Sequence, residues 1–200
     1  DSNVNAVSQE EEEGKKVNYA GGIVGKNKNG TVTNCSFTGV VKAESNYYNY
    51  AGGLVGCNYD DVVITNCCNY GDVYASGSHY FNDTGGIVGY NIDGSVVNCS
   101  NFGSVTSSSN NGCNNAGGIV GSNGGGVKDC YNEGIVIAAN GDESSAGGVV
   151  GYNWHKVTDC NNEGAVTAQD GNYNGAGGVA GFSLGEVTGC SNKGAVSAQD

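Results

Sequence analysis

A six-residue motif recurs at nearly even spacing along the chain. It reads Ala-Gly-Gly, an aliphatic residue, Val and Gly, and it starts at residues 20, 51, 84, 116, 146 and 176. Thr84 replaces the alanine in the third copy, and Ala180 replaces the valine in the last. A fixed period of 30 to 33 residues is the signature of a solenoid, in which each repeat is one structural unit stacked on the next.

Two further features recur in phase with this motif. A cysteine follows each copy, and a Gly-x-Val-x-Ala run follows each cysteine, with Ser107 in place of the alanine once. The cysteines are Cys35, Cys67, Cys99, Cys130, Cys160 and Cys190. These phases predict one solenoid domain over 1–200 with repeats at 20–50, 51–83, 84–115, 116–145, 146–175 and 176–200. Residues 1–19 are expected to be a partial preceding repeat and a loop, because 2–8 resemble 191–197, and the array is expected to be a section of a longer protein.

The segments within each repeat have the pattern of strands. Val136 and Ala138 alternate with Ile135 and Ile137, and a period of two is typical of a strand. The chain contains 37 glycines, and each would cost about 1 kcal/mol inside a helix. We therefore expect an all-β parallel β-helix, or β-solenoid, of about six coils with three short strands in each coil.

Stacking coils in register would align equivalent residues as ladders along the axis. The cysteines and the valines of the Val32 and Val41 type are expected to line the interior. Two polar ladders are expected to hydrogen-bond along the axis, as stacked amides do in cross-β packing. The first contains Asn34, Asn66, Asn98, Asp129 and Asp159, and the second contains Asn27, Asn58, Asn91, Asn123 and Asn153. Glycines are expected to supply the left-handed corners between strands.

The adjacent aliphatic pair of the motif, such as Ile23 and Val24, leaves two interpretations open. A flat strand would expose one of the two columns as an aliphatic stripe for lateral association. Alternatively, the chain bends at this point and both columns are buried.

The Ala-Gly-Gly-aliphatic-Val-Gly core resembles the GLUG motif, and Gly53-Leu54-Val55-Gly56 matches its signature. The resemblance covers residues 20 to 200. The family occurs as tandem repeats in large bacterial cell-surface and secreted proteins, including adhesin-like proteins and the non-catalytic region of IgA-cleaving metallopeptidases. The resemblance implies a β-helical surface module and no specific ligand. The zinc signature His-Glu-x-x-His of those peptidases does not occur in this sequence.

Nine cysteines allow three interpretations. The six in phase are expected to be small buried residues filling the interior. Disulfides between neighbouring coils are the alternative, since Cα atoms about 4.8 Å apart lie within the permitted range, although parallel side chains would strain the bridge. Metal binding is disfavoured because no Cys-x-x-Cys pair occurs, and we expect no metal and no cofactor.

Two groups of aromatic residues are candidate ligand-binding positions. Tyr90 and Tyr152 directly follow the motif in their repeats, and Trp154 lies two residues after Tyr152. These three are expected to form an aromatic platform for a carbohydrate, or to be cross-strand packing. The irregular segments before each motif are interpreted as edge loops that contact a glycan or a host protein, or only shield the edge. Their candidate residues are Tyr47, Tyr48, Tyr80 and Tyr173.

Composition excludes several classes of function. The net charge is −12 and no arginine is present, which argues against nucleic-acid binding. No apolar run approaches the roughly 20 residues that cross a bilayer. A glycosidase needs two carboxylates at a fixed separation, whereas the carboxylates here recur as ladder members, so we expect no enzymatic activity. Acidic segments such as Asp142-Glu143 leave calcium binding open.

These observations predict a structural module from the surface or exterior of a bacterial cell, acting as a stalk or an adhesin segment. One alternative is a module that binds a carbohydrate or a host protein through its aromatic edge. The other is a fibre subunit that self-assembles end to end, since uncapped coils expose backbone groups.

Overall fold

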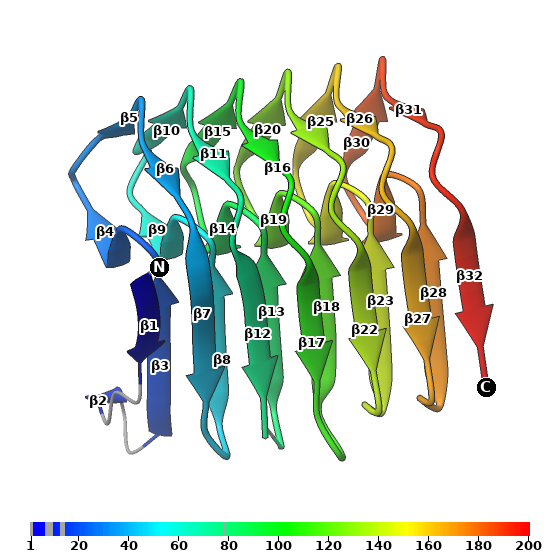
Figure 1. Ribbon diagram of the computed structural model, residues 1–200. Coiled ribbons are helices and arrows are strands. Elements are labelled where there is room, and N and C mark those ends of the chain that lie inside the picture. The colour runs from blue at the N-terminus through cyan, green and yellow to red at the C-terminus, as the bar shows by residue number, and fades with distance from the viewer. Residues whose placement is uncertain (1, 7–9, 13–14, 78) are drawn as a thin grey trace.

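A computed structural model describes residues 2–6, 10–12, 15–77 and 79–200 of the chain, with side-chain surroundings from residue 16 onward. The regular elements in these ranges are all strands, and they wind as a parallel β-solenoid of six turns (Figure 1). This confirms the predicted fold class and the number of turns. The predicted number of strands is wrong, because each turn contains five strands, and five sheets run along the rod.

Sheets 1 and 2 meet at the GLUG-like motif, whose first two residues end a strand of sheet 1 and whose last two begin a strand of sheet 2. Sheet 1 contains β3 (Lys15–Gly21), β8 (Tyr48–Gly52), β13 (Phe81–Gly85), β18 (Cys113–Gly117), β23 (Glu143–Gly147) and β28 (Tyr173–Gly177). Sheet 2 contains β4 (Val24–Lys28), β9 (Val55–Tyr59), β14 (Val88–Asn91), β19 (Val120–Asn123), β24 (Val150–Asn153) and β29 (Ala180–Ser183).

Sheets 3 and 4 consist of strands of two or three residues around each in-phase cysteine. Sheet 3 contains β5 (Val32–Thr33), β10 (Val63–Thr65), β15 (Ser95–Val97), β20 (Gly126–Lys128), β25 (Lys156–Thr158) and β30 (Glu186–Thr188). Sheet 4 contains β6 (Ser36–Phe37), β11 (Cys68–Asn69), β16 (Ser100–Asn101), β21 (Tyr131–Asn132), β26 (Asn161–Asn162) and β31 (Ser191–Asn192).

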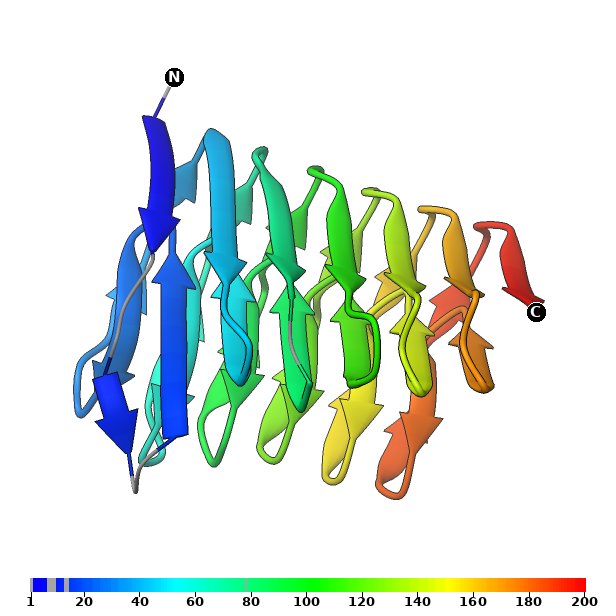
Figure 2. The same cartoon turned by 90° about the horizontal axis from the view of Figure 1, so that it is seen from below.

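Sheet 5 is formed by the Gly-x-Val-x-Ala runs. It contains β1 (Ser2–Ala6), β7 (Gly39–Glu44), β12 (Asp72–Ser76), β17 (Val105–Ser108), β22 (Val136–Ala139), β27 (Val166–Gln169) and β32 (Val196–Gln199). Equivalent residues of successive turns are direct partners, as in Val41 with Val73 and Val73 with Val105. Figure 2 shows these turns side by side along the rod.

The segments interpreted from sequence as edge loops form most of sheet 1. Asn49 and Ala51 of β8 are fully buried and point into the core, while Tyr50 between them points out. The alternation is that of a strand, but its inward positions hold asparagine and alanine in place of large apolar residues, which hides the pattern in the sequence.

The aliphatic pair of the motif is buried on both columns. Leu54 and Val55 have no exposed surface, and the equivalent pairs of turns three, four and five are also fully buried. The backbone bends between sheets 1 and 2, so that the amides of both Ile23 and Val24 donate to the carbonyl oxygen of Leu54. Ile23 of the first turn is 45% exposed, but the pairs of turns two to five are buried. The motif therefore forms no exposed stripe for lateral association, which removes that alternative.

Stacked asparagines line the interior as hydrogen-bonded ladders. The predicted ladder of Asn27, Asn58, Asn91, Asn123 and Asn153 is present, and each amide donates to the next at 2.9–3.0 Å. A second ladder that sequence analysis missed joins Asn69, Asn101, Asn132, Asn162 and Asn192 at 2.7–2.8 Å. A third joins Asn18, Asn49, Asn82 and Asn114 at 2.9–3.1 Å and ends at Ser144.

The predicted polar ladder that begins at Asn34 has a different role from the expected one. Asn34, Asn66, Asn98, Asp129 and Asp159 lie at the corner between sheets 3 and 4 with φ between 51° and 56°. Asparagine and aspartate tolerate this left-handed conformation better than other side chains, so they, rather than glycine, turn the chain here. The Asn98 amide also donates to Asn66 at 2.7 Å, on the exposed surface.

The second glycine of each motif is required by close packing. A Cβ atom on Gly53 would lie 2.4 Å from Cγ of Asn69, and one on Gly86 would lie 2.3 Å from Cγ of Asn101. The same contact recurs in every later turn. The second glycine of the motif thus lies against the amide ladder that begins at Asn69. This contact explains why the glycine and the asparagine recur in phase.

The acidic run near the start departs from the expected loop. Glu10–Glu12 forms β2, which pairs antiparallel with the start of β3 and sets Glu11 opposite Lys16. Oppositely charged residues at directly opposed positions favour such pairing. Within the described ranges, no helix is long and apolar enough to cross a membrane.

Candidate functional site

Sheets 1 and 2 meet at a corner where their outward side chains contact each other. Tyr50 of sheet 1 and Tyr90 of sheet 2 have ring centroids 5.2 Å apart, and Asn115 donates to Ser122 at 3.2 Å across the same corner. The sharp bend at the Gly-Gly pair produces this arrangement, because it folds the two outward faces toward one another. This corner is the candidate site because it brings together three of the predicted aromatic residues.

Aromatic rings follow the corner along the rod axis from the first turn to the last. We call this the aromatic row, and it consists of Tyr19, Tyr50, Tyr90, Trp154, Tyr152 and Phe182. Successive ring centroids lie 5.6, 5.2, 6.4, 4.3 and 4.7 Å apart. The predicted platform of Tyr90, Tyr152 and Trp154 is therefore brought together as part of a longer feature.

The aromatic row lacks a ring in the fourth turn, where Asn115 and Ser122 lie beside Asp83 of the third turn. The Asp83 carboxylate accepts hydrogen bonds from the Ser122 hydroxyl at 2.6 Å and from the Asn115 amide at 2.8 Å. Asp83 and Asn115 are each 4% exposed and Ser122 is fully buried. Burial raises the pKa of the Asp83 carboxyl to about 6, and the hydrogen bonds from Ser122 and Asn115 oppose that rise.

Trp154 leans over this ring-free step. Tyr90 and Trp154 belong to turns three and five, so their strands lie about 9.6 Å apart along the axis. Their ring centroids are only 6.4 Å apart, so the two rings lean toward each other across the position of Ser122. The side chain of Trp154 is nevertheless exposed, with 45% of its surface accessible.

The hydroxyls of Tyr50 and Tyr90 stay protonated at neutral pH. Burial, followed by the charge of Asp83, raises the pKa of Tyr90 to about 12. The same two causes raise the pKa of Tyr50 further. These hydroxyls can therefore donate hydrogen bonds as well as accept them.

Of the other predicted ligand-binding residues, Tyr48 contacts Tyr50 of the aromatic row, with ring centroids 6.4 Å apart. Tyr47, Tyr48 and Tyr80 stack with one another, with centroids 5.6 Å apart for Tyr47 and Tyr80 and 5.4 Å apart for Tyr48 and Tyr80. Tyr173 lies on β28 beside Glu143 and is 74% exposed. The structure thus divides the predicted residues into a row, an edge stack and one separate side chain.

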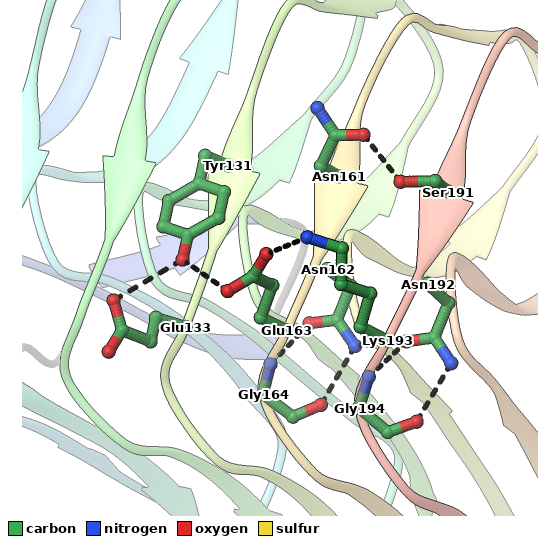
Figure 3. Close-up of polar contacts among 10 residues, drawn as sticks. All are labelled: Tyr131, Glu133, Asn161, Asn162, Glu163, Gly164, Ser191, Asn192, Lys193 and Gly194. Carbon is green, nitrogen blue, oxygen red and sulfur yellow. Dashed lines mark hydrogen bonds and ion pairs between the residues drawn. The ribbon is translucent and has the colours of Figure 1, made fainter.

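A polar cluster lies on the outer face of sheet 4 and the adjoining loops (Figure 3). The Tyr131 hydroxyl lies 3.1 Å from a carboxylate oxygen of Glu163 and 3.3 Å from one of Glu133, and Lys193 pairs with Glu163 at 2.7 Å. The Lys193 ammonium and the Tyr131 hydroxyl lower the pKa of Glu163. Because these side chains are largely exposed, water screens the charges and each pair contributes little to stability.

The cysteines are free thiols, and six of them stack as predicted. Cys67, Cys99, Cys130 and Cys160 are buried, while Cys35 and Cys190 of the end turns are half-buried. Each buried thiol donates to a backbone carbonyl two residues earlier at 3.2–3.3 Å, and no disulfide joins any of the nine cysteines. The six therefore fill the interior as small residues. Among the described residues, no group of three His, Cys, Asp or Glu side chains could hold a metal ion.

Sequence analysis missed Tyr19, Tyr50, Asp83, Asn115 and Ser122 as members of this corner. The first four directly precede the alanine or threonine of the motif. That shared phase was the available signal, but these residues belong to segments interpreted as a loop. Nothing local to Asp83 indicates that a serine 39 residues away donates to it.

Comparison with known families identifies the repeat. The profile of the GLUG motif matches residues 17–42, 82–106 and 142–167, which lie in turns one, three and five. The search of curated proteins and the search of solved structures returned no match. The intervening turns contain equivalent strands, which pair in register with the strands of the matched turns. The chain therefore contains three GLUG motifs, consistent with the family that its repeat pattern resembles.

Proposed function

We propose that this chain is a non-enzymatic extracellular repeat module, acting as a stiff stalk or adhesin segment of a bacterial cell-surface protein. The observation that supports this function is the unbroken register of six turns, in which the core amides of each turn are hydrogen-bonded by the next. Bending or shearing the rod would break these buried bonds, each of which costs about 1–3 kcal/mol to leave unmade. A segment of this kind acts as a rigid spacer, which holds whatever is attached to it at a fixed distance and orientation and needs no reactive site.

The location is tested on the organism that produces the chain. Antibodies raised against residues 20–200 are expected to label intact cells, or to detect the chain in the medium. Labelling that appears only after the cells are permeabilised contradicts the proposal.

The stiffness is tested by limited trypsin digestion of the folded chain. Lys128 and Lys156 have exposed side chains, but both lie within paired strands of sheet 3. Cleavage requires local unfolding that breaks the interior ladders, so we expect both sites to resist the protease. Rapid cleavage at either site in native buffer contradicts a stiff module. End-to-end association into fibres stays a prediction, which light scattering over a concentration series would test.

A further inference from the structure

We propose that the aromatic row binds an uncharged polysaccharide chain that lies along the rod axis, with Trp154, Tyr152 and Phe182 as the main contact. This function goes beyond a structural stalk and does not depend on it. The row extends from the first turn to the sixth, and its last three members lie within two adjacent turns.

Accessibility favours this end of the row. Trp154 and Phe182 are each 45% exposed, and Tyr152 is half-buried. Large aromatic side chains exposed together on a surface are characteristic of binding sites. Tyrosine and tryptophan also supply a large contact area with little loss of conformational entropy, because each has only two side-chain torsions.

The linear shape of the row fits a chain of sugar rings. From turn one to turn six it extends about 24 Å along the axis, with rings recurring from turn to turn except in the fourth. A pyranose ring has apolar C–H faces that stack on aromatic rings and hydroxyl groups at its edge that need polar partners. The rings of Tyr90 and Tyr152 contact the exposed indole, and their hydroxyls can serve as those partners.

The charges at the corner favour an uncharged ligand. The cations in the sheet 2 columns of this corner are Lys26 and Lys28 of the first turn, and both are already engaged. Lys26 lies over the rings of Tyr19 and Tyr59, and Lys28 pairs with Asp60 at 3.9 Å. The Asp83 carboxylate lies beneath the middle of the row, and the chain has a net charge of −12. An anionic polysaccharide would meet repulsion with no cation to bind it.

A peptide strand fits this corner less well than a sugar chain. The backbones of sheets 1 and 2 are paired from turn to turn along the row, so they offer no free edge for strand addition. A protein ligand would have to bind through side chains alone, in a row one ring wide.

The chain contains a single tryptophan, which makes its fluorescence a probe of the proposed site. We would titrate the folded chain with neutral linear hexasaccharides, namely cello-, xylo-, manno- and chitohexaose, and with a hexamer of galacturonic acid. We expect a saturable change in Trp154 emission with at least one neutral hexasaccharide and none with the acidic hexamer.

Variants then locate the binding. Tyr152→Ala and Phe182→Ala retain Trp154 and are expected to weaken binding about tenfold or more, because each removes a contacting ring. Tyr70→Ala is the matched control, since Tyr70 is a 55% exposed ring stacked on Phe102 at a distant face. Thermal unfolding of each variant verifies that it folds.

Three results would overturn the proposal. The first is that no neutral hexasaccharide causes a saturable change in the Trp154 emission of the wild-type chain. The second is unchanged affinity in both Tyr152→Ala and Phe182→Ala. The third is a protein ligand that changes Trp154 emission while the saccharides do not.

Discussion

Replacing Asp83 with asparagine should stabilise the protein at neutral pH. Asp83 is buried with hydrogen bonds from one hydroxyl and one amide, and it forms no ion pair with a cation in the described part of the chain. Burial raises the pKa of its carboxyl from 3.8 to about 6, so folding must desolvate a charge above pH 6. Asparagine keeps an acceptor oxygen at this position and removes that charge.

The magnitude follows from the pKa. A rise from 3.8 to about 6 corresponds to about 3 kcal/mol of folding free energy. The folded state binds the proton more tightly than the unfolded state, so this group destabilises the fold progressively as pH rises from about 4 to about 6. Below pH 4 the wild type and Asp83→Asn should be nearly equal in stability. At pH 7.5 the variant should be more stable by about 3 kcal/mol, or by about 6–12 °C in Tm.

The assay is urea and thermal unfolding of both proteins at a series of pH values, followed by the emission of Trp154. Comparing the two chains at each pH cancels the titration of every other carboxyl. Asp93→Asn is the control, because Asp93 is exposed and its replacement should change stability by under about 0.5 kcal/mol. Equal Tm values for wild type and Asp83→Asn at pH 7.5, or a difference that does not vary with pH, would refute this reasoning.

Three further substitutions test the interior, each by urea unfolding against the wild type. Ser144→Asn should stabilise the protein by about 1–2 kcal/mol, because it completes the amide ladder that begins at Asn18. In the wild type, the Ser144 hydroxyl and the Asn174 amide oxygen are buried in this ladder without hydrogen-bond partners. Destabilisation by Ser144→Asn would contradict this prediction. Thr84→Val should stabilise by about 1–2 kcal/mol, because it replaces a fully buried, unpartnered hydroxyl by a methyl group of similar size, and a loss of stability would count against it. Asn101→Ala should destabilise by about 3–5 kcal/mol, because it removes bonds to two neighbouring amides and to a glycine carbonyl; a loss below 1 kcal/mol would show that the ladder is dispensable.

The repeat itself made the fold predictable from sequence. Equivalent residues recur every 30 to 33 positions. In a stacked solenoid, each repeat contacts only its neighbours, so equivalent residues of successive turns lie next to each other. The cysteine column and one asparagine ladder follow from that single inference. The number of strands did not follow, because strands of two residues such as Ser36–Phe37 are too short to show alternation.

The candidate site was predictable only in part. Tyr152 and Trp154 are two residues apart on one strand face, so their proximity could be read from spacing. The approach of Trp154 to Tyr90, two turns away, depends on how far the rings lean, and spacing does not encode that. The burial of Asp83 likewise arises from the bend between sheets 1 and 2, which brings Ser122 against it.

The central claim is that each repeat makes one turn about a common axis. Genetically encoded spin labels test it directly, because they leave the native cysteines in place. One label replaces Thr33, and the second replaces Lys128, Thr158 or Thr188, which are the equivalent sheet 3 residues three, four and five turns away. The account predicts that the distance between labels grows by about 5 Å with each added turn. Distances that do not increase with turn number would contradict it.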